Sequence, residues 1–318
     1  MALELLWPGP AGALGGLVAE AALGYPAALH RRLPHPVVWI GAAISALERR
    51  WNQPERRPAE RRVLGVVTVT LAAGGAGLAG WLLQRLCAVP PFGLVLFALL
   101  ASVGLAQRSL HAHVAAVRRA LDAGDLQAAR RAVGLIVGRD VQALDEGQVA
   151  AAALESLAES FNDGVVAPAF WLALAGLPGL FVYKAVNTAD SLIGHMEPRW
   201  RAFGWAAART DDLMNLIPAR LAGVLIALAG RGGYRMMLRD ARRHASPNAG
   251  WPEAAMAGAL GRRLGGPARY DGALVERPGF GDGPAPEAAD LRRGLRLYLA
   301  ACALLWILTA VGALAWRL

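Results

Sequence analysis

Four short polar blocks stand at the ends of strongly apolar segments in the middle of the chain, at residues 155–164, 183–191, 209–215 and 244–253. An ionisable side chain near the centre of a bilayer costs about 2.5–3.5 kcal/mol or more, so such side chains pair, line a wet cavity or bind a ligand. The residues of these blocks are therefore the first candidates for chemistry.

The first block carries three carboxylates and one amide. Glu155, Glu159, Asn162 and Asp163 fall at i, i+4, i+7 and i+8, on one face of a helix. Like charges at this spacing repel and favour a bound cation. Carboxylate oxygens suit Mg²⁺, which completes its shell with water and substrate phosphates. The alternative is a solvated acidic face balanced by the arginines of residues 130–139.

The second block contains Lys184, the only lysine of the chain. An ammonium group and a planar guanidinium group do different chemistry, so Lys184 could have a specific role. The alternative is that it is a chance exception in an arginine-rich chain, and both interpretations stay open. Lys184, Asn187, Ser191 and His195 fall at i, i+3, i+7 and i+11 and could form a phosphate-binding surface. Polar residues at this spacing also form seams between packed helices. Asp190 points elsewhere on such a helix.

The third and fourth blocks add further acids, amides and cations. Two acids open the next apolar segment, although acids at a helix N-terminus can simply complement the helix dipole. The members of this third block are Arg209, Asp211, Asp212 and Asn215. The fourth block leads into a helix predicted to begin near Pro252, whose free N–H groups would attract an anion. Its candidates for phosphate binding are Arg243, His244, Ser246, Asn248 and Glu253. The chain has no P-loop, nucleophile-elbow, zincin or kinase signature.

The elements that must position these blocks are long apolar segments. Of the 318 residues 55% are hydrophobic and only 18% are charged, which indicates a membrane protein. About 20 apolar residues span a bilayer as a helix. We predict an all-α polytopic membrane protein with a single membrane-embedded domain. Its spans are expected near residues 3–29, 64–86, 91–107, 165–186, 216–230 and 297–316.

The arginines indicate which parts face the cytoplasm. They concentrate in residues 31–62, 108–139 and 231–296, which the positive-inside rule holds in the cytoplasm. We therefore predict a cytoplasmic helical insert at 108–163 and a cytoplasmic basic loop region at 231–296. The net charge of +9 fits this orientation. Without exposed aromatics on a soluble module, it does not indicate binding to nucleic acid.

Local signals predict where the helices around the first block begin and break. Asp145 with Gln148 resembles a capping box and predicts a helix over residues 146–161. A break is expected at residues 123–125. Residues 165–186 contain Gly176 and Pro178, so they either cross the membrane or form a broken, re-entrant hairpin, as buried irregular backbone allows. We expect both 165–186 and 216–230 to be irregular.

At these blocks the chain resembles the CobD/CbiB family, the adenosylcobinamide-phosphate synthases of cobalamin (vitamin B12) biosynthesis. The matching stretches are HPV at residues 35–37, ESLAESFNDGVVAP at 155–168, YKAVNTADSLIG at 183–194, DDLMNLIPAR at 211–220, and SPNAGWPEAAMAGAL at 246–260 with LGGP at 264–267. Two residues depart from the family pattern: Tyr25 stands where the family tends to have an acid, and Ala245 where it has a proline.

The resemblance implies an ATP-dependent ligase that joins a propionate carboxylate of adenosylcobyric acid to the amine of aminopropanol phosphate. Its implied cofactors are ATP and Mg²⁺. Its implied partners are the corrinoid and the amino-alcohol phosphate, the lipid bilayer and other membrane-bound cobalamin-assembly enzymes. It would lie in the cell inner membrane as a multi-pass protein, with the active site on the cytoplasmic side. A carboxylate condenses with an amine only after activation, and phosphoryl transfer needs mainly positioning and charge neutralisation.

Side-chain chemistry suggests roles within this reaction. We predict that Glu155, Glu159 and Asp163 hold Mg²⁺. Lys184 would meet the transferred phosphoryl group or a substrate phosphate. The other predicted catalytic residues are Asp190, Asp211 and Asp212. The predicted substrate- or phosphate-binding residues are Asn187, Ser191, Arg209, Asn215, Arg243, His244, Ser246, Asn248 and Glu253. The competing class is a membrane transporter or sensor that shares the fold, although a transporter often shows inverted repeats and no repeat is visible here.

Overall fold

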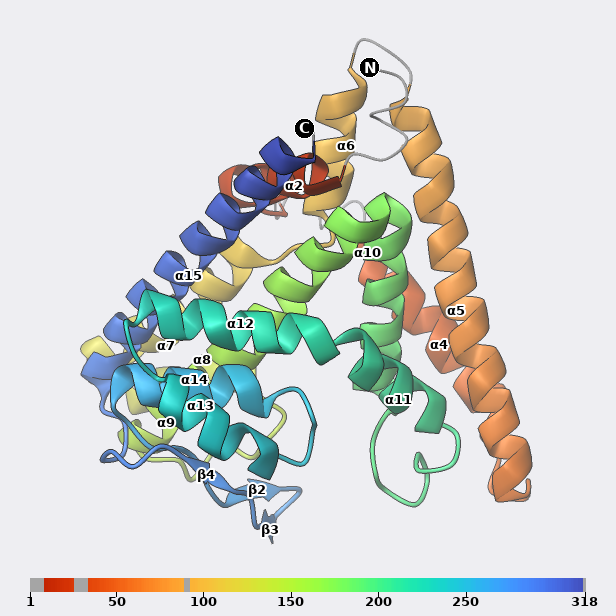
Figure 1. Ribbon diagram of the computed structural model, residues 1–318. Helices are drawn as coiled ribbons and strands as arrows, with labels where there is room; N and C mark the ends of the chain where they lie inside the picture. Colours follow the sequence, from red (N-terminus) through yellow and green to blue (C-terminus); the bar gives the residue numbers. More distant parts are fainter. Residues whose placement is uncertain (1–8, 26–33, 89–91, 317–318) are drawn as a thin grey trace. The chain divides into compact units, whose positions relative to one another are not determined.

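The computed structural model describes residues 9–25, 34–88 and 92–316, and these are almost entirely helical (Figure 1). The only strands in these ranges are four short ones of two or three residues. The all-α prediction is therefore confirmed. The chain divides into two compact units, each described below by itself: the first comprises Met1–Ala106, Ala167–Asn215 and Thr309–Leu318, the second Gln107–Val166 and Leu216–Leu308.

Long apolar helices confirm that the protein is polytopic. Within the described ranges four helical stretches are long and apolar enough to cross a membrane: Pro58–Cys87, Gly93–Asp122, Glu146–Ile193 and Ala288–Ala315. A fifth arises if Trp205–Met214 and Leu216–Ala229 together form one broken span. The ends of the predicted span at 3–29 and the first residue of the one at 91–107 lie outside the described residues.

The first unit is built around two long helices that pack along each other, α5 and α10. Its helices are α2 (Gly9–Leu23), α4 (Pro36–Trp51), α5 (Pro58–Cys87), α6 (Gly93–Ser102), α10 (Ala167–Ile193) and α11 (Trp205–Met214), with the end of α15 (Ala288–Ala315). A close backbone approach occurs at Gly65 of α5, where an added Cβ would meet the carbonyl group of Phe203. Glycine is therefore required there for the packing of α5.

The HPV stretch fixes the start of α4. His35 precedes the helix, and its Nδ1 accepts the N–H of Val37 at 3.3 Å. Because Nδ1 accepts, the proton of a neutral ring lies on Nε2, which donates to the carbonyl of Val103 at 2.9 Å. Pro36 stands in the first turn, where its missing N–H is not needed. The stretch thus ties α4 to the segment after α6.

Helix α10 is broken in its middle, as expected for residues 165–186. Ala175 and Gly176 leave the helical conformation, with Gly176 at φ 65° and ψ −155°, and Pro178 follows. Figure 1 shows the chain rising to this break and descending beyond it. Gln84 of α5, which is buried, accepts the N–H of Leu177 at 2.8 Å. This bond satisfies a backbone group that the break would otherwise leave unpaired at membrane depth.

The second predicted irregular segment, 216–230, is itself a continuous helix, and the irregularity is a bend of 49° between α11 and this helix. Helix α12 (Leu216–Ala229) is continuous. Pro218 stands in its first turn, where no intrahelical N–H bond is lost. The interruption lies one residue earlier, at Asn215, between α11 and α12.

The second unit places helix α14 against α9, α12 and α13. Its helices are α7 (Gln107–Asp122), α8 (Leu126–Val133), α9 (Glu146–Phe161), the π-helical turn η1 (Asn162–Val166), α12, α13 (Tyr234–Asp240), the 3₁₀ turn η2 (Ala241–Arg243), α14 (Gly250–Leu260) and most of α15. The predicted capping box is present, because Asp145 accepts the N–H of Gln148 at 2.8 Å and Gln148 accepts that of Asp145 at 2.9 Å. The predicted bounds of α9 and the break at 123–125 are confirmed.

The basic loop region carries two short antiparallel ribbons. Strand β1 (Leu264–Gly265) pairs with β4 (Gly279–Phe280), and β2 (Ala268–Tyr270) pairs with β3 (Ala273–Val275). Asp271 and Gly272 join β2 to β3 with φ of 48° and 79°. Two positive φ values in an Asp-Gly turn match the twist of a two-residue hairpin. The loops between these strands border the site described next.

Candidate functional site

Glu155 is the ionic anchor of the second unit. The residue lies on α9 and is 3% exposed. Oε2 forms an ion pair with Arg139 and lies 3.5 Å from a guanidinium nitrogen of Arg277, while Oε1 accepts the N–H of Gly265 at 2.8 Å. One carboxylate thus joins α9, the loop that precedes it, and the β1–β4 region. Arginine balances this acid, as in the alternative left open above, but the carboxylate is buried and not on a solvated face.

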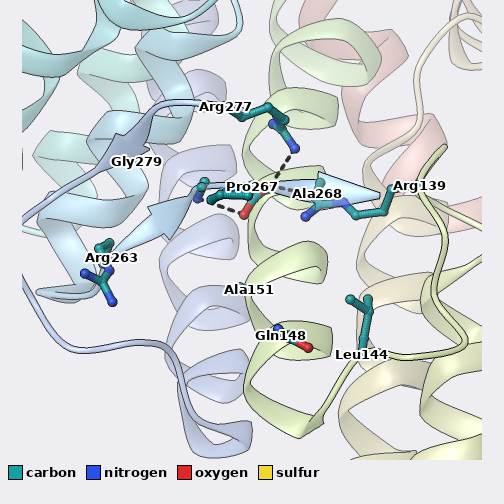
Figure 2. Close-up of a pocket in the computed structure, with 12 residues that line it drawn as sticks. Arg139, Leu144, Gln148, Ala151, Arg263, Pro267, Ala268, Arg277 and Gly279 are labelled. Carbon is teal, nitrogen blue, oxygen red and sulfur yellow. Dashed lines mark hydrogen bonds and ion pairs between the residues drawn. The ribbon is translucent and has the colours of Figure 1, made fainter. Parts of the chain in front are cut away.

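A pocket of about 510 Å³ opens beside this anchor (Figure 2). Three arginine side chains line it: one from the loop before α9, one from just before β1, and one from the segment between β3 and β4. Its charged lining residues are Arg139, Arg263, Arg277 and Glu155. Gly265, Gly266 and Pro267 add a wall of backbone. Figure 2 shows Arg139, Arg263 and Arg277 around the pocket, with Pro267 and Ala268 between them. The pocket is cationic and suits an anionic ligand.

The other two predicted metal ligands do not join Glu155 in a preformed centre. Glu159 is exposed, one turn beyond Glu155. Helix α9 ends at Phe161, so Asp163 lies on the π-helical turn and not at the predicted helical spacing. Its Oδ1 accepts the side-chain N–H of Asn162 at 2.7 Å. Among the described residues no group of three His, Cys, Asp or Glu side chains could hold a metal ion.

The loop before α14 is closed by its own side chains. The Ser246 hydroxyl accepts the N–H groups of Asn248 and Ala249 at 3.2 and 3.3 Å, and the Ser246 N–H donates to Nδ1 of His244 at 2.9 Å. Arg220 of α12 donates to Oδ1 of Asn248 at 3.2 Å. These predicted phosphate ligands therefore shape the start of α14, and the loop N–H groups of residues 248 and 249 are already satisfied.

Arg243 and Glu253 differ sharply in burial. Arg243 is 55% exposed and lies 3.4 Å from Asp240. Glu253 is buried on α14, with Oε1 3.7 Å from Nε2 of His244 and Oε2 without a hydrogen-bond partner among the described residues. Burial, together with the charges of Glu159 and Glu155, raises the pKa of Glu253 well above its usual value. Burial lowers the pKa of His244, so this pair favours its neutral forms.

Asp211 is the centre of a second cluster, in the first unit. Its two carboxylate oxygens accept from Asn187 at 3.3 Å and from Asn215 at 3.0 Å. The Tyr183 hydroxyl donates to Oδ1 of Asn215 at 3.2 Å. Asn187 and Tyr183 come from α10, while Asp211 comes from α11. These contacts form a polar seam between packed helices, which was the alternative to a phosphate-binding surface for the helix face that carries Asn187.

The remaining residues of the second and third blocks lie around this seam. Lys184 is partly buried on α10. Ser191 bonds back to the carbonyl of Asn187 at 2.9 Å. Helix α10 ends at Ile193, so His195 lies beyond it and the predicted fourth member of the helical face is wrong. Asp190 is partly buried near the same end, and Arg209 pairs with Asp212 at 3.0 Å within α11.

The structure thus gathers the predicted residues into two groups, one in each unit. The second unit holds Glu155, Glu159, Asp163, Arg243, His244, Ser246, Asn248 and Glu253, and the first holds Lys184, Asn187, Asp190, Ser191, Arg209, Asp211, Asp212 and Asn215. The sequence analysis did not select Arg277, and it assigned no role to the side chain of Arg263. The sequence signal that could have found them is Glu155, an acid on a predicted helix that needs a cation, together with the arginines on either side of the LGGP stretch.

The chain matches the CobD/Cbib protein family over residues 13–298. It is 50% identical to a cobalamin biosynthesis protein CobD of Rhodobacter capsulatus over 301 residues, which are 93% of this chain and 95% of that protein. Proteins of the same name from a Sinorhizobium species and from Geobacter metallireducens are 48% and 47% identical, over 90% and 88% of this chain and 92% and 91% of their own length. No solved structure matches the chain.

Proposed function

Because the chain belongs to the CobD/CbiB family of cobalamin biosynthesis, we propose that it is an ATP-dependent carbon–nitrogen ligase. It would join a propionate carboxylate of adenosylcobyric acid to the amine of aminopropanol phosphate, giving adenosylcobinamide phosphate. The observation that carries this proposal is the arginine-lined pocket. It is built from Glu155 and Gly265–Pro267, which belong to two of the stretches on which the family resemblance rests.

The proposed reaction has two balanced steps. A carboxylate oxygen of the corrinoid attacks the γ-phosphorus of ATP, which gives an acyl phosphate and releases ADP. The amine nitrogen then attacks the acyl carbon, phosphate leaves with the bonding electron pair, and the nitrogen loses a proton. Phosphoryl transfer of this kind depends on positioning and on neutralising charge. Arginines around a buried carboxylate supply fixed positive charge at low reorganisation cost.

Magnesium enters this proposal as part of the Mg–ATP substrate. The described carboxylates do not form a resident three-ligand centre, and Glu155 is already engaged by two arginines. Mg²⁺ bound to a nucleotide takes most of its ligands from phosphates and water. One or two protein oxygens therefore suffice, and Glu159 and Asp163 stay the predicted donors. Lys184 stays the predicted contact of the transferred phosphoryl group or of a substrate phosphate.

We also place the reaction at the cytoplasmic face of the cell inner membrane. The support is the arginine content of residues 231–296, which hold Arg263 and Arg277, together with the positive-inside rule. Other membrane-bound enzymes of cobalamin assembly are the proposed partners for transfer of the corrinoid.

The test is a turnover assay on detergent-purified protein with adenosylcobyric acid, Mg–ATP and either aminopropanol phosphate or free aminopropanol, followed by mass spectrometry. We expect the amide product only with nucleotide, and with the phosphorylated amine. Amide product from free aminopropanol alone would support the ligase activity and would replace aminopropanol phosphate with the free amine as its substrate. No amide with either amine, from protein that unfolds cooperatively, would refute the ligase and favour the transporter or sensor class.

A further inference from the structure

The pocket beside Glu155 carries more positive charge than its own acid can balance. Three of its lining residues are arginines and one is a glutamate, so two positive charges remain in surplus. The side chains of Arg139 and Arg277 are only 12% and 19% exposed. Charges held at low exposure act through a lower effective dielectric and attract a counter-ion more strongly than surface charges do.

Arg263 is the least constrained of the three cations. Its backbone N–H bonds to Pro284, but within the described part of the chain its guanidinium group forms no hydrogen bond or ion pair. Arg139 and Arg277 are instead oriented by Glu155. A guanidinium group has five N–H donors, so an ion pair with one carboxylate leaves donors for a ligand. The pocket therefore combines two pre-oriented guanidinium groups with a third that is available.

The backbone wall shapes the pocket and does not supply its donors. Gly265 and Gly266 have φ of 75° and 91°, which side-chain-bearing residues rarely adopt. The Gly265 N–H is bonded to Glu155, and the Gly266 N–H to the carbonyl of Pro278 at 3.1 Å. Recognition of an anion must then come from the arginine side chains. Guanidinium forks bind phosphate oxygens in pairs, which suits a phosphate monoester or a nucleotide phosphate.

We propose that the pocket lined by Arg139, Arg263 and Arg277 binds the phosphate group of a substrate, with Glu155 as the positioning residue for two of its arginines. This inference deepens the proposed function and rests on it for the source of the phosphate, which is either the nucleotide or the amino-alcohol phosphate. Neither the pocket nor Arg263 and Arg277 were among the candidate residues drawn from the motifs.

The test is a binding measurement that needs no turnover. Calorimetry on detergent-purified protein compares three probes: Mg–ATP, aminopropanol phosphate, and aminopropanol without the phosphate. The test variant is Arg263→Gln, which removes no hydrogen bond or ion pair among the described residues. The control is Arg235→Gln, which removes one exposed positive charge of α13, away from the pocket. A third variant, Arg263→Lys, keeps the charge and removes the planar fork.

We expect Arg263→Gln to weaken one phosphate probe about tenfold to a hundredfold, the range of a lost charge-assisted hydrogen bond. The probe that loses affinity identifies the source of the phosphate. Arg263→Lys should restore part of the affinity, and Arg235→Gln should match wild type. Equal binding of both phosphate probes to wild type and Arg263→Gln would overturn the proposal, as would wild-type protein that binds neither. Phosphate binding without any amide product would refute the ligase and leave the pocket assignment standing.

Discussion

Glu155→Gln is the sharpest perturbation of the second unit, because one carboxylate serves three partners. The amide keeps the size of the side chain and an oxygen for the Gly265 N–H, which lies 2.8 Å from Oε1. It removes the charge that balances Arg139 and Arg277, whose side chains are 12% and 19% exposed. Breaking a buried ion pair and leaving the other charge uncompensated costs about 3–5 kcal/mol. That loss corresponds to a fall of about 5–10 °C in the unfolding midpoint of a chain of this size.

The assay is thermal unfolding followed by tryptophan fluorescence in detergent. The matched control is Glu276→Gln, an exposed glutamate of the same loop region, for which we expect less than about 0.5 kcal/mol. Because the cost comes from the stranded cation, Arg139→Gln combined with Glu155→Gln should lose less than the sum of the two single changes. A Glu155→Gln protein as stable as the control, or additive losses in the double variant, would refute the role of Glu155 as an ionic anchor.

Three further predictions follow from other parts of the structure. Gly65→Ala should lower the unfolding midpoint clearly, because its Cβ would meet the backbone of Phe203. The control is Gly74→Ala in the same helix, whose Cβ meets nothing within 4 Å, so it should be neutral or slightly stabilising. Equal midpoints for the two variants would contradict the close approach at Gly65. The raised pKa of Glu253 means that the folded state binds this proton more tightly than the unfolded state, so its contribution to stability is complete below about pH 4.5 and is lost as pH rises through the folded pKa. Stability of wild type should therefore fall more steeply with rising pH than that of Glu253→Gln, and parallel pH profiles would argue against a buried, protonated acid. Lys184→Arg keeps the charge and changes its shape, so we expect a loss of ligase turnover of at least tenfold with an unchanged unfolding midpoint; turnover close to wild type would remove the special role of this lysine.

Local signals in the sequence predicted the helices well. The capping pair Asp145 and Gln148 set the start of α9, since both of its hydrogen bonds form within four residues of chain. Gly176 and Pro178 likewise marked the break in α10, because glycine reaches a positive φ and proline lacks an N–H. Such signals need no knowledge of what packs against the segment, and they transfer directly from sequence to structure.

The parts that depend on distant partners were not predictable in the same way. Arg277 lies 122 positions after Glu155 in the chain, and only the folded β1–β4 region brings it to that carboxylate. Helical periodicity placed Asp163 on the face of Glu155, but the π-helical turn that follows Phe161 changes that spacing. The prediction that His195 shares a helical face with Lys184 was wrong for a related reason, because α10 ends at Ile193. The side-chain types were informative, whereas their grouping required the tertiary structure.

The most direct test of the ligase is an isotope experiment on adenosylcobyric acid labelled with ¹⁸O in the reacting carboxylate. If the acid is activated by phosphorylation, one labelled oxygen leaves with the phosphate when the amine attacks the acyl carbon. We expect one ¹⁸O in inorganic phosphate for each amide formed, with aminopropanol phosphate and Mg–ATP present. Amide formation with the label in AMP, or unlabelled phosphate, would contradict the acyl-phosphate route, and the absence of any amide would contradict the ligase itself.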